Sequence, residues 1–460
     1  MATLRSLREA FRAAPFPDRQ ERTRALDRLL TLILERRDAI ADAISDDFGH
    51  RSRHESLVSE VYVTAAGIRY IKKHLRAWMA PEPRPVTLAL QPARARIVPQ
   101  PLGVIGIISP WNYPIQLALL PLAYALAAGN RVMLKPSELT PGTSELMRTL
   151  LADAFHPDHV AVITGGPEVG AAFSELPFDH LFYTGSTRVG RLVMQAAAKN
   201  LTPVTLELGG KSPAWIHPDY PTEKAAASIA MGKLFNAGQT CVAPDYVLVR
   251  RDQADALERA LVASIEEMYP GLVDNPDYTS IINDQHRERL QGYLADAEAH
   301  GARLVTINPA SESFEASTKL APVLIRDPTE EMAVMQEEIF GPLLPIVAVD
   351  SVDAAAAYIN DHPRPLAMYV FDRDKARVEG LLRHTHAGGV SVNDTMLHVA
   401  EEHLPFGGVG PSGMGAYHGR EGFDTFSHRK AVLHQPRLNS RFLLAPPYGR
   451  TIERLLDLLI

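Results

Sequence analysis

The chain contains a single cysteine, and the residues around it suit a reactive thiol. Cys241 ends the run Phe-Asn-Ala-Gly-Gln-Thr-Cys, in which Gly238 lets the backbone come close to the sulfur and Thr240 suits a turn. A thiolate is a strong nucleophile where nearby donors, a helix start or a positive partner stabilise its charge. The alternative is a small buried hydrophobic residue, which is the usual place of a lone cysteine.

A candidate general base precedes the cysteine in the chain. Glu207 ends an apolar segment that we expect to be a strand, and Leu208 and two glycines follow it. A carboxylate at the carboxyl end of a parallel strand points into the cleft where such sheets bind ligands, and partial burial raises its pKa toward that of a useful base. The alternative is a glutamate that caps a helix or forms a structural ion pair.

A candidate oxyanion donor is Asn112, in the run Trp-Asn-Tyr-Pro that follows another predicted strand. Its neutral amide can donate to the oxygen that becomes negative when a nucleophile adds to a carbonyl group. The alternative is a turn former, because Asn before an aromatic residue and a proline commonly begins a turn.

Two glycine patterns compete for the role of binding a phosphate. Gly408–Gly413 has the spacing of a dinucleotide fingerprint, but no strand precedes it and Pro411 stands where the helix should begin, so we interpret it as a flexible or tightly packed loop. Gly185–Gly190 lacks the middle glycine, yet it follows a predicted strand and opens a predicted helix. We therefore expect the Ser186 hydroxyl and the helix N–H groups to hold a pyrophosphate.

Charged residues follow the second predicted strand of this sheet. Lys135 and Glu138 are placed to hydrogen-bond an adenosine ribose, and Glu138 would repel a 2′-phosphate. The alternative is an exposed ion pair three residues apart. The segment 336–342 places Glu338 and Phe340 around a short turn, where a helix end is the alternative. The 17 histidines show no ligand spacing, so we expect no metal.

Short apolar strands alternate with helices after residue 104, which predicts an α/β fold with a parallel sheet covered by crossover helices. The expected strands are Val104–Ile108, Arg131–Leu134, Val160–Ile163, His180–Tyr183 and Val204–Leu208, with helices around 114–128, 142–155, 167–174 and 188–199. A second α/β stretch is expected after Gly209, with strands at Asp245–Val249, Ile346–Val349, Ala367–Val370 and Gly389–Val392.

The segments before and after these α/β stretches have other sequence patterns. Residues 18–46 carry apolar side chains at helical spacing. Pro-rich residues 81–101 predict an extended excursion or hairpin outside the main fold. Leu455, Leu456 and Leu459 belong to a short amphipathic piece of the tail, which is more suited to packing on a neighbour than to anchoring in a bilayer.

The composition excludes several classes of protein. A formal charge of −7 without long basic runs argues against a nucleic-acid partner or a basic membrane patch. One cysteine cannot form an internal disulfide and suits a reducing compartment. Leu117–Ala128 is the longest apolar stretch and is too short to span a bilayer, and the charged N-terminus lacks a signal-like apolar region. We therefore expect a cytoplasmic protein without a membrane span.

Seven motifs occur in an order that resembles the aldehyde dehydrogenase superfamily over essentially the whole chain. They are PWNYP from Pro110, KPSE from Lys135, GSTRVG from Gly185, ELGGKSP from Glu207, FNAGQTC ending at Cys241, EEIFGP from Glu337, and PFGG with SGMG between Pro405 and Gly415. The resemblance implies that Cys241 is the nucleophile and Glu207 the general base. It implies that Asn112 and the backbone N–H of Cys241 form the oxyanion hole.

The resemblance also implies a nicotinamide cofactor, NAD with NADP as a possibility. It places Lys135 and Glu138 at the adenosine ribose, Ser186 at the pyrophosphate, and Glu338 with Phe340 at the nicotinamide ribose. Three further residues are assigned to the cofactor site with them: Ser109, Trp111 and Gly185.

The short N-terminus and the run HVAEEHLPFGGVGPSGMGAYHG resemble the class 3 branch of the superfamily, and within it the bacterial enzymes that act on coniferyl aldehyde. An aromatic aldehyde such as coniferyl aldehyde is therefore the expected substrate, which is oxidised to the acid through a cysteine thioester. Medium- or long-chain aliphatic aldehydes are an alternative, as are a relative that passes the acyl group to CoA and a catalytically silent structural relative. The residues Ala416-Tyr417-His418 replace a second glutamate of tetrameric classes, so Glu207 alone is expected to be the base.

The resemblance implies three parts and a homodimer. Residues 1–80 and 102–208 are expected to form a Rossmann-like NAD-binding domain, and residues 209–425 an α/β catalytic domain. Residues 81–101 and 426–460 are expected to form a small β-rich oligomerisation hairpin with a C-terminal tail.

Overall fold

A six-stranded sheet forms the first α/β body of the protein, which we describe from a computed structural model that covers residues 1–437, 439 and 445–459. The strand order is β15-β7-β6-β3-β4-β5, and all neighbours are parallel except β15 and β7. The bounds are β3 Val104–Ile108, β4 Arg131–Lys135, β5 Val160–Val162, β6 His180–Thr184, β7 Val204–Glu207 and β15 Gly413–Met414. The five strands expected here from the apolar segments are confirmed.

Helices cover both faces of this sheet, because successive strand residues point to opposite faces. Ile105 and Ile107 face a core shared with α2, α5, α6 and α7, whereas Val104 and Ile108 face a core shared with α1, α8 and α9. The bounds are α1 Ala2–Ala13, α2 Arg19–Glu35, α3 Arg37–Phe48, α4 Arg53–Ser56, α5 Val63–Trp78, α6 Gln116–Ala128, α7 Pro141–Ala154, α8 Pro167–Ser174 and α9 Thr187–Ala198. A π-helical turn, Leu57–Tyr62, joins α4 to α5.

A seven-stranded sheet forms the second body, in the order β10-β11-β12-β9-β8-β13-β14. Only β10 is antiparallel to its neighbour. The strands are β8 Pro213–Ile216, β9 Tyr246–Arg250, β10 Arg303–Thr306, β11 Val323–Arg326, β12 Leu343–Val349, β13 Ala367–Phe371 and β14 Gly389–Val392. The helices are α10 Thr222–Leu234, α11 Ala254–Met268, α12 Asp284–Ala299, α13 Ala333–Gln336, α14 Val352–Asp361 and α15 Lys375–His384.

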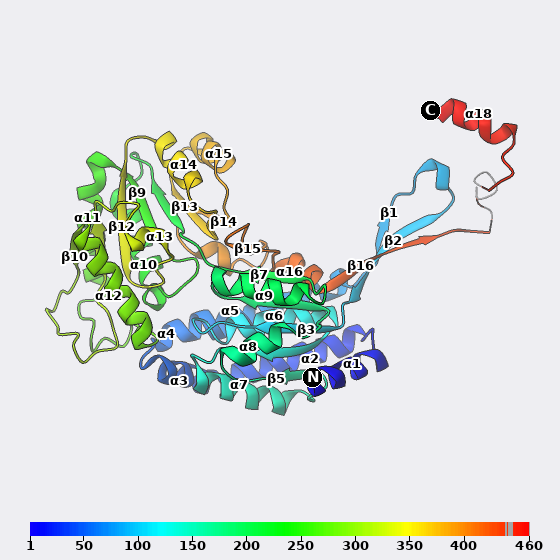
Figure 1. Cartoon of the computed structure of the whole chain (residues 1–460), viewed down its shortest axis with the longest axis horizontal. Helices are drawn as coiled ribbons and strands as arrows, with labels where there is room; N and C mark the ends of the chain where they lie inside the picture. Colours follow the sequence, from blue (N-terminus) through cyan, green and yellow to red (C-terminus); the bar gives the residue numbers. More distant parts are fainter. Residues whose placement is uncertain (438, 440–444, 460) are drawn as a thin grey trace.

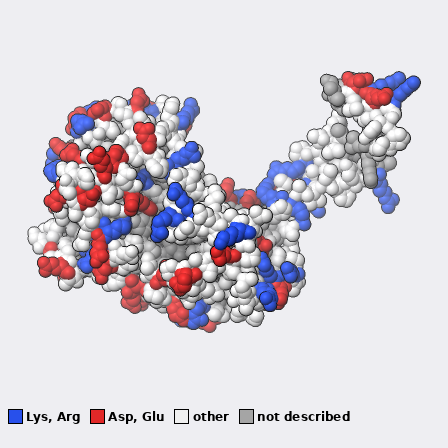
Figure 2. Space-filling view, viewed as in Figure 1, with Lys and Arg blue, Asp and Glu red and all other residues white. Residues whose placement is uncertain are grey.

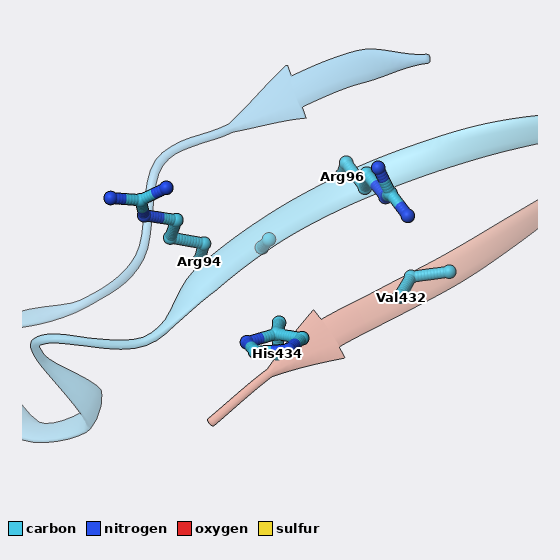
Figure 3. Close-up of a pocket in the computed structure, with 5 residues that line it drawn as sticks. Arg94, Arg96, Val432 and His434 are labelled. Carbon is cyan, nitrogen blue, oxygen red and sulfur yellow. The ribbon is translucent and has the colours of Figure 1, made fainter. Parts of the chain in front are cut away.

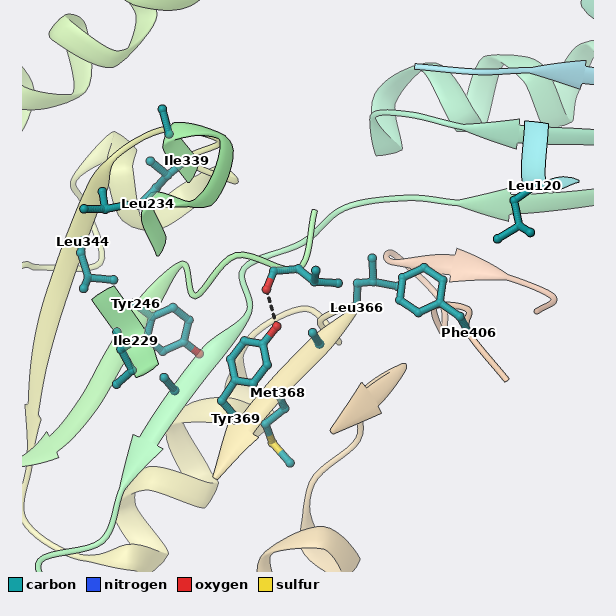
Figure 4. Close-up of a cluster of buried hydrophobic side chains, with 14 of the residues drawn as sticks. Leu120, Ile229, Leu234, Tyr246, Ile339, Leu344, Leu366, Met368, Tyr369 and Phe406 are labelled. Carbon is teal, nitrogen blue, oxygen red and sulfur yellow. Dashed lines mark hydrogen bonds between the residues drawn. The ribbon is translucent and has the colours of Figure 1, made fainter. Parts of the chain in front are cut away.

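The core of the second body reaches the segment that carries the cysteine (Figure 4). Ile229 and Leu234 of α10 pack in it with Tyr246 of β9. The fully buried Tyr369 of β13 donates a hydrogen bond from its hydroxyl to the carbonyl oxygen of Val242. The backbone directly after Cys241 is therefore tied to the middle of the sheet.

A three-stranded antiparallel arm projects from the first body, as Figure 1 shows. Its strands are β1 Glu82–Arg84, β2 Arg94–Pro101 and β16 Ser427–His434, and β16 pairs with β2 along its whole length. The excursion expected at 81–101 is thus a hairpin completed by a strand of the tail. The amphipathic helix expected in the tail is α18 Arg450–Leu459, at the far end of the arm. Residues 438, 440–444 and 460 of the expected tail lie outside the described residues.

Two features bear on the organisation of the chain. β15 and α16 Gly419–Thr425, which we placed with the second body, lie against the first: β15 pairs with β7, and α16 contacts α5 and α6. Among the helices of the described residues, none combines the length and the apolar character needed to cross a membrane.

Candidate active site

Glu207 is the last residue of β7 and lies at the carboxyl edge of the first sheet. Only 3% of the residue is exposed, and neither carboxylate oxygen has a hydrogen-bond partner among the described residues. Burial raises its pKa well above the usual range of a glutamate. It therefore neither caps a helix nor forms an ion pair, and it is free to take a proton.

Cys241 lies opposite this carboxylate, after α10 and the turn Phe235–Gly238. Burial, and then the negative charges of Glu338 and Glu207, raise the pKa of the thiol to about 12. The structure thus brings Cys241 close to both glutamates. A thiol in these surroundings reacts only when a base removes its proton, since the thiolate is not the favoured form.

Asn112 is tied to the backbone that leads to the cysteine. Its side-chain amide donates to the Gln239 carbonyl at 3.1 Å, and its own carbonyl accepts from Arg51 at 2.8 Å. The next residue, Tyr113, shares a hydrogen bond of 2.6 Å with the Thr240 hydroxyl. The Asn112 amide carries a second N–H, which suits donation to a substrate oxygen next to Cys241.

Glu338 lies at the same place from the opposite body. A Cβ added to Gly209 would lie 2.1 Å from a carboxylate oxygen of Glu338, so the glycine leaves the room that this side chain occupies. Burial, and then Asp245, raise the pKa of Glu338 to about 8. Phe340 contacts Trp111 with ring centroids 5.4 Å apart. The pair Glu338 and Phe340 expected around a turn therefore lies beside Trp111 and the cysteine.

The expected phosphate end of the site follows β6. Ser186 caps α9, and its hydroxyl accepts from the Val189 N–H at 3.4 Å. A Cβ on Gly185 would meet the Tyr183 hydroxyl at 2.3 Å, so the chain runs close to the sheet edge here. The buried hydroxyls of Ser109 and Thr184 have no partner among the described residues. Free donors around a helix start fit the polar groups of a bound dinucleotide.

The expected ribose end follows β4. Lys135 and Glu138 form an ion pair of 2.7 Å, in which 4% of the lysine side chain and 36% of the glutamate side chain are exposed. This is the pairing that we weighed as the alternative, although the lysine is buried and not exposed. Both residues still lie at the carboxyl edge of the sheet. That each of them hydrogen-bonds a ribose hydroxyl when a cofactor is bound stays a prediction.

The loop Gly408–Gly413 is tightly packed, which was one of the two interpretations of this segment. A Cβ on Gly408 would lie 2.0 Å from the Ser412 carbonyl oxygen. Gly413 pairs with Glu207, and the Pro411 carbonyl accepts from the Thr187 hydroxyl of α9 at 3.0 Å. The loop therefore supports the strand that carries the candidate base and the start of α9.

Several residues near this edge were not found from the sequence. Tyr417 is fully buried with its hydroxyl near Glu207 and Cys241, and Gln116 is its hydrogen-bond partner. Glu55 and Arg51 reach the same region from the N-terminal helices. Glu55 and Arg51 belong to no motif, and only the packing of distant segments reveals them, whereas Tyr417 lay in a recognised run without a role assigned to it. Among the described residues, no group of three or more His, Cys, Asp or Glu could hold a metal ion.

Polar groups without partners among the described residues gather at the carboxyl edge of the first sheet, near the single thiol of the chain, which is typical of an α/β enzyme that binds a nucleotide. The chain belongs to the aldehyde dehydrogenase family, whose model matches residues 2–432, and it is accordingly an enzyme that oxidises aldehydes. The expected family and the expected α/β fold are thereby confirmed.

Individual relatives agree with this assignment. A coniferyl aldehyde dehydrogenase of a Pseudomonas strain is 50% identical over 439 residues, which cover 95% of this chain and 91% of the relative. Mouse aldehyde dehydrogenase family 3 member B2 is 42% identical over 464 residues, 99% of this chain and 94% of the relative. The solved substrate-bound AldH of Staphylococcus aureus is 37% identical with a TM-score of 0.94, covering 100% of this chain and 99% of that one. Other solved relatives were determined as complexes with NAD+.

Proposed function

We propose that the chain oxidises an aldehyde to its carboxylic acid through a covalent intermediate on Cys241. Glu207, directly or through a water, takes the thiol proton, and the sulfur adds to the carbonyl carbon. The Asn112 amide and the Cys241 backbone N–H stabilise the oxyanion, which is worth about 2.7 to 4 kcal/mol per donor. A nicotinamide cofactor held at the sheet edge by Ser109, Lys135 and Gly185 would supply the acceptor for the hydride of this carbon. Glu207 releases the thiol proton to solvent and then deprotonates a water, which hydrolyses the thioester; the freed sulfur takes up a proton and becomes a thiol again.

One observation carries this proposal: both carboxylate oxygens of the buried Glu207 have no hydrogen-bond partner among the described residues, and the carboxylate lies near enough to the single thiol to raise its pKa. An unpaired buried carboxylate is costly for a fold, and such groups are concentrated at functional sites. A base that must accept a proton twice in one turnover needs oxygens that no other donor occupies.

We propose NAD as the preferred cofactor and residues 1–80 and 102–208 as its binding domain. Residues 209–425 form the proposed catalytic domain, apart from β15 and α16, which pack on the first body. The sheet edge at Ser109, Lys135 and Gly185 supports the assignment. A carboxylate at Glu138, which is partly exposed, would accept from a 2′-hydroxyl and repel a 2′-phosphate. We also propose a cytoplasmic location, because a thiol nucleophile needs a reducing compartment.

We propose an aromatic aldehyde such as coniferyl aldehyde as the substrate, on the strength of the Pseudomonas relative. The test is a panel of coniferaldehyde, benzaldehyde, medium-chain alkanals and succinate semialdehyde, each measured with NAD and with NADP. Coniferaldehyde with NAD should give the highest kcat/KM. A higher value for the alkanals would contradict the substrate proposal, and no oxidation of any aldehyde would contradict the activity.

We propose that the arm and tail form the interface of a homodimer. β16 and β1 are the edges of a small sheet that leaves the body, and such edges are prone to pair with another chain. Exposed Leu433, Leu455 and Leu456 lie on the arm and on α18. A two-fold contact would cover these apolar side chains and the strand edges together.

A further inference from the structure

A left-handed turn of three residues lies shortly before Cys241 in the chain. Asn236, Ala237 and Gly238 have φ angles of 53°, 51° and 76°. Left-handed backbone is unfavourable for residues with a Cβ, and three such residues in a row are rare outside glycine-rich loops. At Gly238 an added Cβ would lie 2.3 Å from the Gly341 carbonyl oxygen. The turn therefore needs support from outside the segment.

That support comes from Glu55 on α4, 181 residues earlier in the chain. The Asn236 N–H donates to both carboxylate oxygens of Glu55, at 3.1 Å each. The Thr279 hydroxyl donates to one of them at 2.8 Å. Only 8% of Glu55 is exposed, and its helix is capped by Ser52. A buried carboxylate is thus placed at the first residue of the left-handed turn.

The same turn is bonded to the candidate oxyanion donor. The Asn236 side-chain amide donates to the Asn112 carbonyl at 3.1 Å and to the Gln239 carbonyl at 3.1 Å. Asn112 in turn donates to the Gln239 carbonyl at 3.1 Å. Displacing Asn236 therefore alters the position of Asn112 relative to the backbone that leads to Cys241.

We propose that Glu55 is a positioning residue, which holds Asn236 in the left-handed turn and so sets the geometry between Cys241 and Asn112. It touches no reacting atom and acts through the backbone N–H of Asn236. The inference rests on the proposed roles of Cys241 and Asn112 in aldehyde oxidation.

The electrostatics of Glu55 agree with a role in function more than in stability. Burial raises its pKa to about 6, although Arg51 lies near it and opposes the shift. The group is therefore ionised at neutral pH, and both oxygens accept. Because the pKa is higher in the folded protein than in the unfolded chain, the charged form lowers stability as pH rises through the interval from 4.5 to about 6.

The test compares Glu55→Gln with Asp47→Asn. The amide of Glu55→Gln replaces one acceptor by an NH₂ group that faces the Asn236 N–H. Asp47 is a matched control, because its carboxylate accepts backbone N–H groups of Gly142 at 2.9 Å and Thr143 at 2.7 Å, at the start of α7. The readouts are kcat and KM for an aldehyde, and the burst rate of p-nitrophenol release from p-nitrophenyl acetate, which needs the thiol and oxyanion donors without a cofactor.

We expect Glu55→Gln to lower kcat and the ester burst rate about tenfold, with KM within about twofold, because small misplacements of reacting groups cost rate more than binding. Asp47→Asn should leave all three within about twofold. A folded Glu55→Gln protein with wild-type kcat and burst rate would overturn the proposal. The ester readout is independent of aldehyde oxidation, so failure of the proposed function is recognised separately, by a wild type that oxidises no aldehyde.

A rescue variant tests whether Glu55 acts by supporting the left-handed turn or through another effect of its negative charge. Ala237→Gly removes the Cβ penalty at a left-handed position, so adding it to Glu55→Gln should restore kcat at least about threefold. No restoration would mean that Glu55 does not act by holding the turn. If Glu55→Gln does not fold, Thr279→Val decides: losing one donor to the carboxylate should lower the ester burst about threefold, and an unchanged burst would overturn the proposal.

Discussion

At the scale of single residues, the surroundings of Cys241 resist its ionisation. Burial and two carboxylates hold the pKa of the thiol near 12, so the thiol of the free enzyme is protonated. The raised pKa of Glu207 matches this arrangement, because a carboxylate with a raised pKa accepts a proton from a thiol more readily. Nucleophile and base are therefore coupled, and replacing either one alters the environment of the other.

The first prediction is that Cys241→Ala abolishes aldehyde oxidation and leaves dinucleotide binding nearly unchanged. No second cysteine exists that could replace the nucleophile. Turnover measured with coniferaldehyde, and binding measured by calorimetry, check the two parts. One equivalent of iodoacetamide should inactivate the wild type. Aldehyde oxidation by a clean Cys241→Ala preparation would show that another group is the nucleophile.

The second prediction concerns Glu138. Replacing this carboxylate by an amide removes the repulsion of a 2′-phosphate, so Glu138→Gln should raise the ratio of kcat/KM with NADP to that with NAD. A change of about fivefold, equivalent to about 1 kcal/mol, is expected for a partly exposed charge. The control is Glu145→Gln, a carboxylate on α7 whose ion pair with Arg148 is exposed. An unchanged ratio in Glu138→Gln would remove Glu138 from the ribose site.

At the scale of elements, the apolar segments located the parallel strands because such strands are buried on both faces. The same rule missed β10 and β11, β8, which begins with Pro213, and β15, whose two residues Gly413 and Met414 are followed by another glycine. It also missed β16, because the strand Ser427–His434 is largely exposed and carries a mixture of charged and apolar side chains. These strands are defined by their partners and not by their own composition.

Some residues of the candidate site could likewise be predicted from the sequence, and others could not. Cys241, Glu207 and Asn112 could be found because each lies at a strand or turn end with glycine or proline nearby. Glu55 could not be found, since its role depends on a contact across 181 residues between a short helix and a turn. Pattern alone also could not decide between an ion pair and a ribose contact for Lys135.

The third prediction tests the turn before the cysteine. Gly238→Ala should lower the free energy of unfolding by about 1 to 3 kcal/mol, because its φ of 76° and the Gly341 carbonyl at 2.3 Å leave no room for a Cβ. Thermal unfolding measures this. Gly292→Ala is the control: it lies within α12 with nothing within 4 Å of its added Cβ, and it should raise stability by about 0.5 to 1 kcal/mol. Equal effects at both positions would contradict this account of the turn.

At the scale of the whole molecule, the arm is the part that has the least contact with the body (Figure 1). Figure 2 shows basic side chains gathered where the arm begins. A pocket on the arm is lined by Arg94, Ala95, Arg96, Val432 and His434 (Figure 3). The two arginines lie on β2 and the histidine lies on the neighbouring strand β16.

The fourth prediction is that the arm makes the protein a dimer. Sedimentation at micromolar concentration should give a species of about twice the 50.5 kDa of one chain, because the apolar side chains of the arm and of α18 need a partner. Leu433→Asp places a charge on an exposed position of β16 and should shift the species toward the monomer. The matched control is Leu201→Asp, at a residue that is 90% exposed on the body. A monomeric wild type would contradict the proposed interface.

The central claim is that Cys241 carries the acyl group and Glu207 releases it. The most direct test is the mass of intact Glu207→Gln protein, mixed with NAD and coniferaldehyde and quenched after the first turnover. We predict that one equivalent of NADH forms in a burst slower than that of the wild type, because the amide cannot take the thiol proton. One feruloyl group per chain should then remain on the peptide that contains Cys241, because the amide cannot deprotonate the hydrolytic water either. Formation of NADH at the wild-type steady rate, with no adduct on Cys241, would contradict the account.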